Sequence, residues 1–216
     1  MRTLLRAAFH LLYNPLAFSY DFVSWAVSIG QWRQWQRQSL PHIVGTRLLE
    51  LAHGTGNLQI DLARAGHRSI ALDRSPHMGR IAKHKLATRH LRPPFVRAGA
   101  QALPFPAGHF TTLLTTFPAD FIAEPATARE CWRVLAPGGR LIIVPAARIV
   151  PAHLADTLAL WLFKLTGQSA PPDPEQWAAR LTRPYHETGF QTRVVTATLP
   201  RSLVWIILAD KPGGME

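Results

Sequence analysis

The sequence predicts a single α/β domain whose seven-stranded, mostly parallel sheet ends in an antiparallel hairpin. Three observations predict it. Short apolar runs alternate with helical stretches from Arg47 onward, a glycine turn follows the first run, and only a short link separates the last two β-rich runs. Alternation favours parallel strands joined by right-handed crossovers, with helices on both faces, whereas a short link suits a hairpin.

The expected elements follow from apolar periodicity and from the proline and glycine residues between them. Residues 2–38 are expected to be helical and are rich in aromatic side chains. The expected strands are residues 47–51, 68–72, 95–98, 110–116, 140–144, 190–198 and 203–209. The expected helices are residues 57–65, 76–88, 124–135, 153–165 and 174–188.

The composition and the net charge indicate the class of protein and the kind of partner it would bind. The chain has 216 residues, 47% hydrophobic and 17% charged, which is typical of a globular domain. Its 24 basic and 13 acidic residues give a net charge of +11, which favours anionic partners such as a membrane surface or nucleic acid. A general bias toward arginine, without any partner, explains the charge equally well. Nucleic acid is disfavoured because no RNA-binding module is recognisable.

The single cysteine, Cys131, excludes a disulfide within the chain and favours a reducing, cytoplasmic setting. No zinc-ligand spacing is present, so no metal is expected. Polar residues interrupt the apolar stretch 7–32, so neither a membrane span nor a secretory signal is expected.

The motif that carries most chemical information runs from Leu48 to Leu58. An apolar run enters a turn containing Gly54 and Gly56, and a helix follows. Glycines let the backbone turn tightly and let a ligand approach the main chain, and the amides at a helix start favour a carboxylate or phosphate. Glu50 on the incoming strand suits an ammonium group. Such a turn can also be merely structural.

Asp73 ends the second expected strand, 19 residues after Gly54. A carboxylate in this place can accept hydrogen bonds from both hydroxyls of a ribose. The alternative is that Asp73 only caps the helix that begins near Ser75–Pro76.

Four blocks of the sequence resemble the motifs of class I S-adenosylmethionine-dependent methyltransferases, in the expected order. They are residues 48–56, the Asp-x-Ser-x-x-Met pattern of residues 73–78, residues 99–106 and residues 133–141. Residues 20–35 resemble the N-terminal segment of the ubiquinone/menaquinone C-methyltransferase group, which small phospholipid N-methyltransferases share.

The resemblance implies a Rossmann-like fold, S-adenosylmethionine as cofactor with S-adenosylhomocysteine as product, and a helical lid over residues 1–40 before a domain of residues 41–212. It also implies that Thr116 and Phe117 border the methyl group. Ala52, His53 and Ala100 stand where the family usually has Gly, Cys and Asp, and Gln101 is the expected substitute at the adenine. The expected cofactor-binding residues are Tyr20, Glu50, Ala52, His53, Gly54, Gly56, Leu58, Asp73, Arg74, Met78, Ala100, Gln101, Ala102, Thr116 and Phe117.

Methyl transfer from a sulfonium depends mainly on alignment and exclusion of water, so no catalytic residue is assigned. Candidates for a general base are His109, Asp120, His153 and Tyr20. Apolar stretches near Trp25 and Trp161 favour a lipophilic small-molecule acceptor, either a quinol ring carbon or a phospholipid amine headgroup, and peripheral contact with an anionic membrane. No protein partner is inferred. A non-catalytic S-adenosylmethionine-binding relative and a nucleotide-dependent oxidoreductase are the alternatives.

Overall fold

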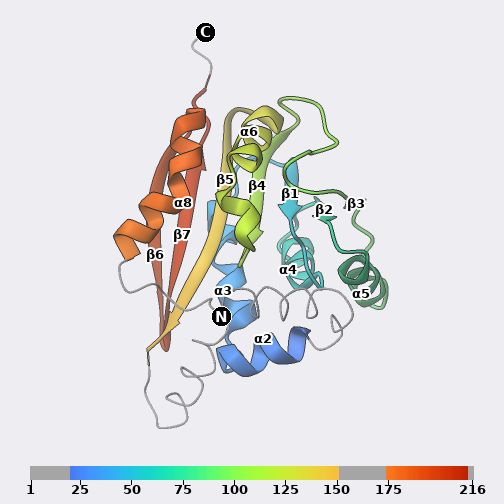
Figure 1. Ribbon diagram of the computed structural model, residues 1–216. Helices are drawn as coiled ribbons and strands as arrows, with labels where there is room; N and C mark the ends of the chain where they lie inside the picture. The colour runs from blue at the N-terminus through green and yellow to red at the C-terminus, as the bar shows by residue number, and fades with distance from the viewer. Residues whose placement is uncertain (1–19, 151–173, 214–216) are drawn as a thin grey trace.

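The computed structural model describes residues 20–150 and 174–213, arranged around a seven-stranded sheet in the order β3-β2-β1-β4-β5-β7-β6 (Figure 1). The strands are β1 Leu48–Leu51, β2 Ser69–Asp73, β3 Phe95–Arg97, β4 Phe110–Thr116, β5 Leu135–Ile149, β6 Gln191–Leu199 and β7 Ser202–Asp210. β1 to β5 pair in parallel, and β7 is antiparallel to both β5 and β6. The predicted parallel sheet with a terminal hairpin is confirmed.

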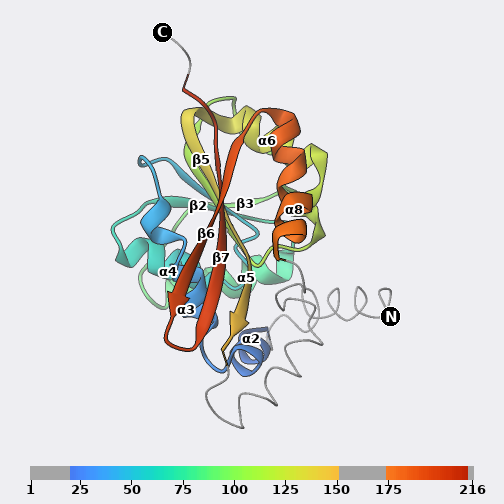
Figure 2. The ribbon, with the colours of Figure 1, turned by 90° about the vertical axis from the view of Figure 1, so that its left-hand side faces the viewer.

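Helices cover both faces of this sheet, as predicted (Figure 2). α3, α4 and α5 lie on one side, and α6 and α8 lie on the other. The helices are α2 Tyr20–Ser28, α3 Trp32–Arg37, α4 Asn57–Arg64, α5 Pro76–Ala87, α6 Pro125–Val134 and α8 Pro174–Thr188, with short 3₁₀ turns at Leu40–His42 and Asp120–Ala123.

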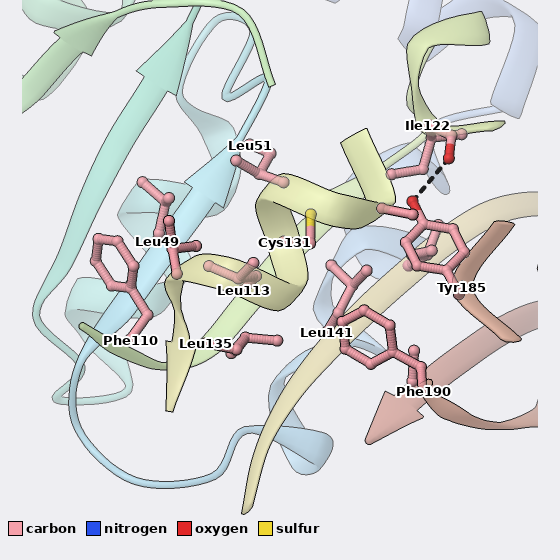
Figure 3. Close-up of a cluster of buried hydrophobic side chains, with 14 of the residues drawn as sticks. Leu49, Leu51, Phe110, Leu113, Ile122, Cys131, Leu135, Leu141, Tyr185 and Phe190 are labelled. Atoms are coloured by element: carbon pink, nitrogen blue, oxygen red, sulfur yellow. Dashed lines mark hydrogen bonds between the residues drawn. The ribbon is translucent and has the colours of Figure 1, made fainter. Parts of the chain in front are cut away.

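Alternation along β1 divides the core into two layers. Leu49 and Leu51 pack on the α6 and α8 side, whereas Leu48 joins the cluster under α3 and α4. Figure 3 shows the first cluster, in which the buried Tyr185 of α8 donates a hydrogen bond of 2.7 Å to the Ile122 carbonyl. This bond ties α8 to the segment that leaves the carboxyl end of β4.

The N-terminal segment is not one continuous helix. Ile29 and Gly30 both have positive φ, at 51° and 74°, and they separate α2 from α3. α3 is a core helix, because Trp35 is fully buried and its indole donates to the Ser202 hydroxyl of β7 at 2.8 Å. The division of the chain at residue 40 therefore stays a prediction. Of the two helices α2 and α3, α2 is the one that lies across the ends at which strands β1 to β5 finish, which we call the carboxyl edge of the sheet (Figure 1).

β5 is far longer than the predicted residues 140–144. It pairs with β7 from Arg140↔Asp210 to Ile149↔Ser202, with an irregularity between Ile143 and Ala146. Pairing with β7 extends β5 beyond its apolar run. The apolar pattern of residues 140–144 alone therefore does not predict the length of the strand. The helix predicted over residues 153–165 lies outside the described residues.

Candidate functional site

The loop between β1 and α4 lies at the carboxyl edge of the sheet. Its backbone turns sharply because Ala52, Gly54 and Gly56 all have positive φ, at 56°, 55° and 80°. For alanine this conformation costs roughly 1 kcal/mol, a strain that a glycine would avoid. The turn aims the main chain of residues 52–56 at the space beyond the strand ends, where open α/β sheets bind their ligands.

The two glycines of this loop have different roles. A Cβ on Gly54 would meet nothing within 4 Å, so this residue borders open space. A Cβ on Gly56 would lie 2.7 Å from Leu86 Cδ1 and 3.0 Å from Ala82 Cβ, so Gly56 lets α4 approach α5. The structure thus brings Gly54 to the candidate ligand site and gives Gly56 a packing role.

Asp73 links the loop to the next crossover. Its carboxylate accepts hydrogen bonds from the Gly54 amide at 2.9 Å and from the Ser75 amide at 2.8 Å. The helix cap is Ser75, whose hydroxyl accepts from the Met78 amide at 3.3 Å. Asp73 is therefore not the N-cap. Each of its two oxygens accepts one described bond and keeps acceptor capacity for a ligand.

Glu50 is almost fully buried, with 1% of its surface exposed. It accepts a 2.6 Å hydrogen bond from the Gln59 amide of α4, and Ser69 in turn donates to Gln59 at 2.9 Å. Burial, aided by the charge of Asp73, raises the pKa of Glu50 to about 8. At neutral pH the side chain is thus a protonated, structural partner of α4, and its contact with an ammonium group stays a prediction.

His53 stabilises the loop from within. It is 5% exposed, its Nδ1 lies 2.8 Å from the Gly54 carbonyl, and its ring meets Phe95 edge-on at 5.2 Å between centroids. Burial lowers the pKa of this imidazole, although Asp73 opposes the shift. A neutral His53 fills the position after Ala52 with a packed ring.

The segment after β3 contains the residues that are predicted to contact adenine. Ala100 is 6% exposed, and the Ala102 amide donates to the Gly99 carbonyl in a tight turn. The Gln101 amide donates to Glu124 at 3.0 Å, so its oxygen is the atom left to accept a hydrogen bond. The turn thus joins residues after β3 to the residue before α6 at the same edge.

An aromatic wall closes the carboxyl end of β4. The Phe117 ring stacks on Trp32 of α3 at 4.1 Å between centroids, and Phe117 has a strained φ of 49°. Next to it, the Thr116 hydroxyl accepts from the Gln36 amide at 2.9 Å. The two residues predicted to border the methyl group are therefore held by α3.

A polar network, which we call the lid clamp, joins α2 to the glycine loop. Its members are Asp21, Thr55, Asn57 and Lys85. Asp21 accepts from the Thr55 hydroxyl at 2.5 Å and from the Asn57 amide at 3.0 Å, and it forms an ion pair with Lys85 of α5. Lys85 also donates to the Asn57 oxygen at 3.0 Å.

Three other predicted cofactor residues lie nearby without a side-chain role that the structure defines. Leu58 is fully buried in the α3 and α4 core, and Met78 is 1% exposed beneath α5. Arg74 is exposed, and its carbonyl accepts from the Arg97 guanidinium at 3.4 Å.

The predicted candidates for a general base lie in different parts of the fold. His109 precedes β4, at the amino edge of the sheet, and is not brought to the glycine loop. Asp120 is exposed and begins the 3₁₀ turn that follows the carboxyl end of β4. Tyr20 is the first residue of α2, and His153 lies outside the described residues. Within residues 20–150 and 174–213 no group of side chains could hold a metal ion.

Sequence reasoning missed the lid clamp and the roles of Trp32 and Gln36. The Tyr20–Asp21 pair was visible, but the partners of Asp21 lie 34 to 64 positions away. Contacts of this range follow from the crossing of α2 over α4 and α5, which local patterns do not specify.

The stability of the protein should fall as pH rises from about 5 to 8, because folded Glu50 keeps its proton where the unfolded carboxyl has lost it. The slope from this group is at most about 1.4 kcal/mol per pH unit. Glu50→Gln should flatten it, measured as the free energy of unfolding in urea at each pH. Glu130→Gln is the control, since Arg133 lowers the pKa of Glu130 and shifts its effect to acid pH. Equal slopes in wild type and Glu50→Gln would contradict the assignment.

Asp21→Ala should release α2, because it removes the ion pair with Lys85 and the two hydrogen bonds that Asp21 accepts from Thr55 and Asn57. We expect faster amide hydrogen exchange over residues 20–28 and a loss of about 1 kcal/mol in stability. Glu187→Ala, which breaks the exposed Arg183–Glu187 pair on α8, is the matched control. Unchanged exchange in α2 would show that the clamp does not hold the helix.

Comparison with known proteins shows what the chain resembles. Residues 49–143 match the family described as "Methyltransferase domain". A demethylmenaquinone methyltransferase of Thermus thermophilus is 34% identical over 139 residues, which cover 62% of this chain and 63% of the relative. A demethylmenaquinone methyltransferase of Deinococcus radiodurans is 26% identical over 220 residues, covering 90% of each.

A solved structure has the same fold. Phosphoethanolamine N-methyltransferase 2 of Haemonchus contortus, in complex with phosphomonomethylethanolamine and S-adenosylhomocysteine, matches with a TM-score of 0.60 and 16% identity over 85% of this chain and 53% of that one. At this identity the likeness concerns the fold alone. The sheet order and this likeness show that the chain has the Rossmann-like fold of the class I S-adenosylmethionine-dependent methyltransferases, and residues 49–143 resemble their methyltransferase domain.

Proposed function

We propose that this protein transfers a methyl group from S-adenosylmethionine to a ring carbon of a lipophilic, quinol-type acceptor. The observation that carries the proposal is the Asp73 carboxylate fixed beside the open space at Gly54. The demethylmenaquinone methyltransferases among the relatives support a quinol as acceptor.

The residues present fit the cofactor. The free acceptor positions of Asp73 suit the ribose hydroxyls, and the open side of Gly54 leaves room for a ligand against the main chain. The Gln101 oxygen suits the amino group of adenine. When bound, S-adenosylmethionine supplies an electrophilic methyl group on a sulfonium.

The acceptor would lie between this site and the aromatic wall. Trp32 and Phe117 pack in the core with only 5% and 4% of their surface exposed, so they close this side of the site to water, and Thr116 lies beside them. A quinol ring carbon must lose a proton on methylation, and Asp120 is the candidate base on the described part of this edge, with Tyr20 and His153 as further candidates.

A second candidate acceptor is the amine headgroup of a phospholipid. Its support is the phosphoethanolamine N-methyltransferase of Haemonchus contortus, which has the same fold. The quinol has the stronger support, since both relatives described above, which match in sequence, are demethylmenaquinone methyltransferases.

Access from a lipid surface is supported by an exposed aromatic pair on α2. Phe22 and Trp25 are 69% and 60% exposed and stack at 6.2 Å between centroids. Their helix is held beside the glycine loop by the lid clamp. Together with the net charge of +11, such a pair suits the interface of an anionic membrane. None of the helices in residues 20–150 and 174–213 is long and apolar enough to cross a bilayer.

The proposal is tested with purified protein, S-adenosylmethionine and either a short-chain reduced quinone or a dispersed phosphatidylethanolamine. We expect methylated quinol and stoichiometric S-adenosylhomocysteine. Asp73→Ala should weaken cofactor binding at least tenfold by calorimetry, whereas Glu187→Ala should not. If only the phosphatidylethanolamine were methylated, the acceptor would be the phospholipid amine and not the quinol. Tight cofactor binding without either product would favour a non-catalytic relative.

Phe22→Ser/Trp25→Ser should reduce binding to anionic vesicles and slow methylation of a long-chain quinol embedded in them. Because both side chains are exposed, the rate with a water-soluble short-chain quinol should stay within about twofold of wild type. Cosedimentation and the two rates measure this. An equal loss with both substrates would assign the pair to the reaction site itself and contradict membrane access.

A further inference from the structure

A cavity at the amino edge of the sheet lies at the opposite end from the glycine loop. Its volume is about 540 Å³, within the range of small-molecule sites. It is lined by residues that lead into the strands, among them Arg47 before β1, Arg68 before β2 and His109 before β4. This cavity shares no lining residue with the cofactor site.

The charged side chains that line the cavity are all basic. Arg47, Arg68 and Arg92 line it together with His67 and His109, and none of its lining residues is acidic. Among the described residues no ion pair joins these three arginines to a carboxylate, although other arginines such as Arg33, Arg133 and Arg140 have acidic partners. Three uncompensated guanidinium groups around one hollow concentrate a positive field and match phosphate oxygens.

The floor of the cavity is apolar but has buried polar groups. Leu86, Leu91 and Phe110 contribute hydrophobic surface. Gln59 and Ser69 line it as well, 2% and 8% exposed, and hydrogen-bond to each other at 2.9 Å. The volume exceeds what an inorganic phosphate needs, so the lining suits an anion that also carries an apolar part.

We propose that this cavity binds an organic phosphate, with the phosphate at Arg47, Arg68 and Arg92 and an alkyl portion against Leu86, Leu91 and Phe110. This site lies apart from the methyltransferase site, although Gln59 in its lining also donates a hydrogen bond to Glu50. The phosphate can belong to a free amphiphile or to a lipid headgroup, and these two sources share the same recognition chemistry.

The test is calorimetric titration of the full chain with octyl phosphate and with inorganic phosphate, and cosedimentation with phosphatidylcholine vesicles containing phosphatidic acid. We expect octyl phosphate to bind at least tenfold more tightly than inorganic phosphate. Arg68→Gln/Arg92→Gln should weaken that binding at least tenfold. Arg129→Gln, an exposed arginine on α6, is the matched control and should bind as wild type. Binding to vesicles that the double variant loses, without binding of octyl phosphate, would identify a lipid headgroup as the source.

The variants replace exposed side chains, so circular dichroism should confirm that they fold. Two results would overturn the proposal. The first is that neither octyl phosphate nor the phosphatidic acid vesicles bind at low salt. The second is that the wild type and the double variant bind them equally. Equal affinity for octyl and inorganic phosphate would overturn the role of the apolar floor. Cofactor titration of the same samples separates these outcomes from a failure of the proposed methyl transfer.

Discussion

The structure of the carboxyl edge depends on a single carboxylate. Asp73 accepts from the Gly54 amide of one crossover and from the Ser75 amide of the next, which fixes the glycine loop against the start of α5. Because the same oxygens are the expected ribose acceptors, the group that shapes the site is also the group that would bind the ligand. The close packing at Gly56 holds α4 and α5 near enough for this arrangement.

Two sets of contacts from the N-terminal segment also stabilise the site. The lid clamp attaches α2 to the first turn of α4 and to α5, while α3 is embedded in the core and stacks Trp32 on Phe117. The strained φ angles at Ala52 and Phe117 lie on either side of the same edge. Of the four non-glycine residues with positive φ in the described chain, these two lie where the ligand is expected, and packing around them compensates the strain.

The sheet, the glycine loop and Asp73 could be predicted from the sequence because each depends on local patterns: apolar periodicity, turn glycines and an acidic residue at a strand end. The length of β5 could not, since it follows from pairing with a strand more than fifty positions away. The burial of Glu50 required the packed structure, because the hydrogen bond to Gln59 depends on how α4 packs against β1. The position of His109 did not, since a residue that precedes a parallel strand lies at the amino end, away from the ligand. The lid clamp combines residues from three helices and a loop, and only the helix crossing brings them together.

The most direct test of the central claim is a crystal structure with S-adenosylhomocysteine. The account predicts that both ribose hydroxyls lie within hydrogen-bond distance of Asp73, with the Gly54 and Ser75 amides still bound to the same carboxylate and the adenine near Gln101. The central claim would be contradicted if the ligand bound at another place. It would also be contradicted if the Asp73 carboxylate lost its hydrogen bonds to both amides in order to bind the ligand.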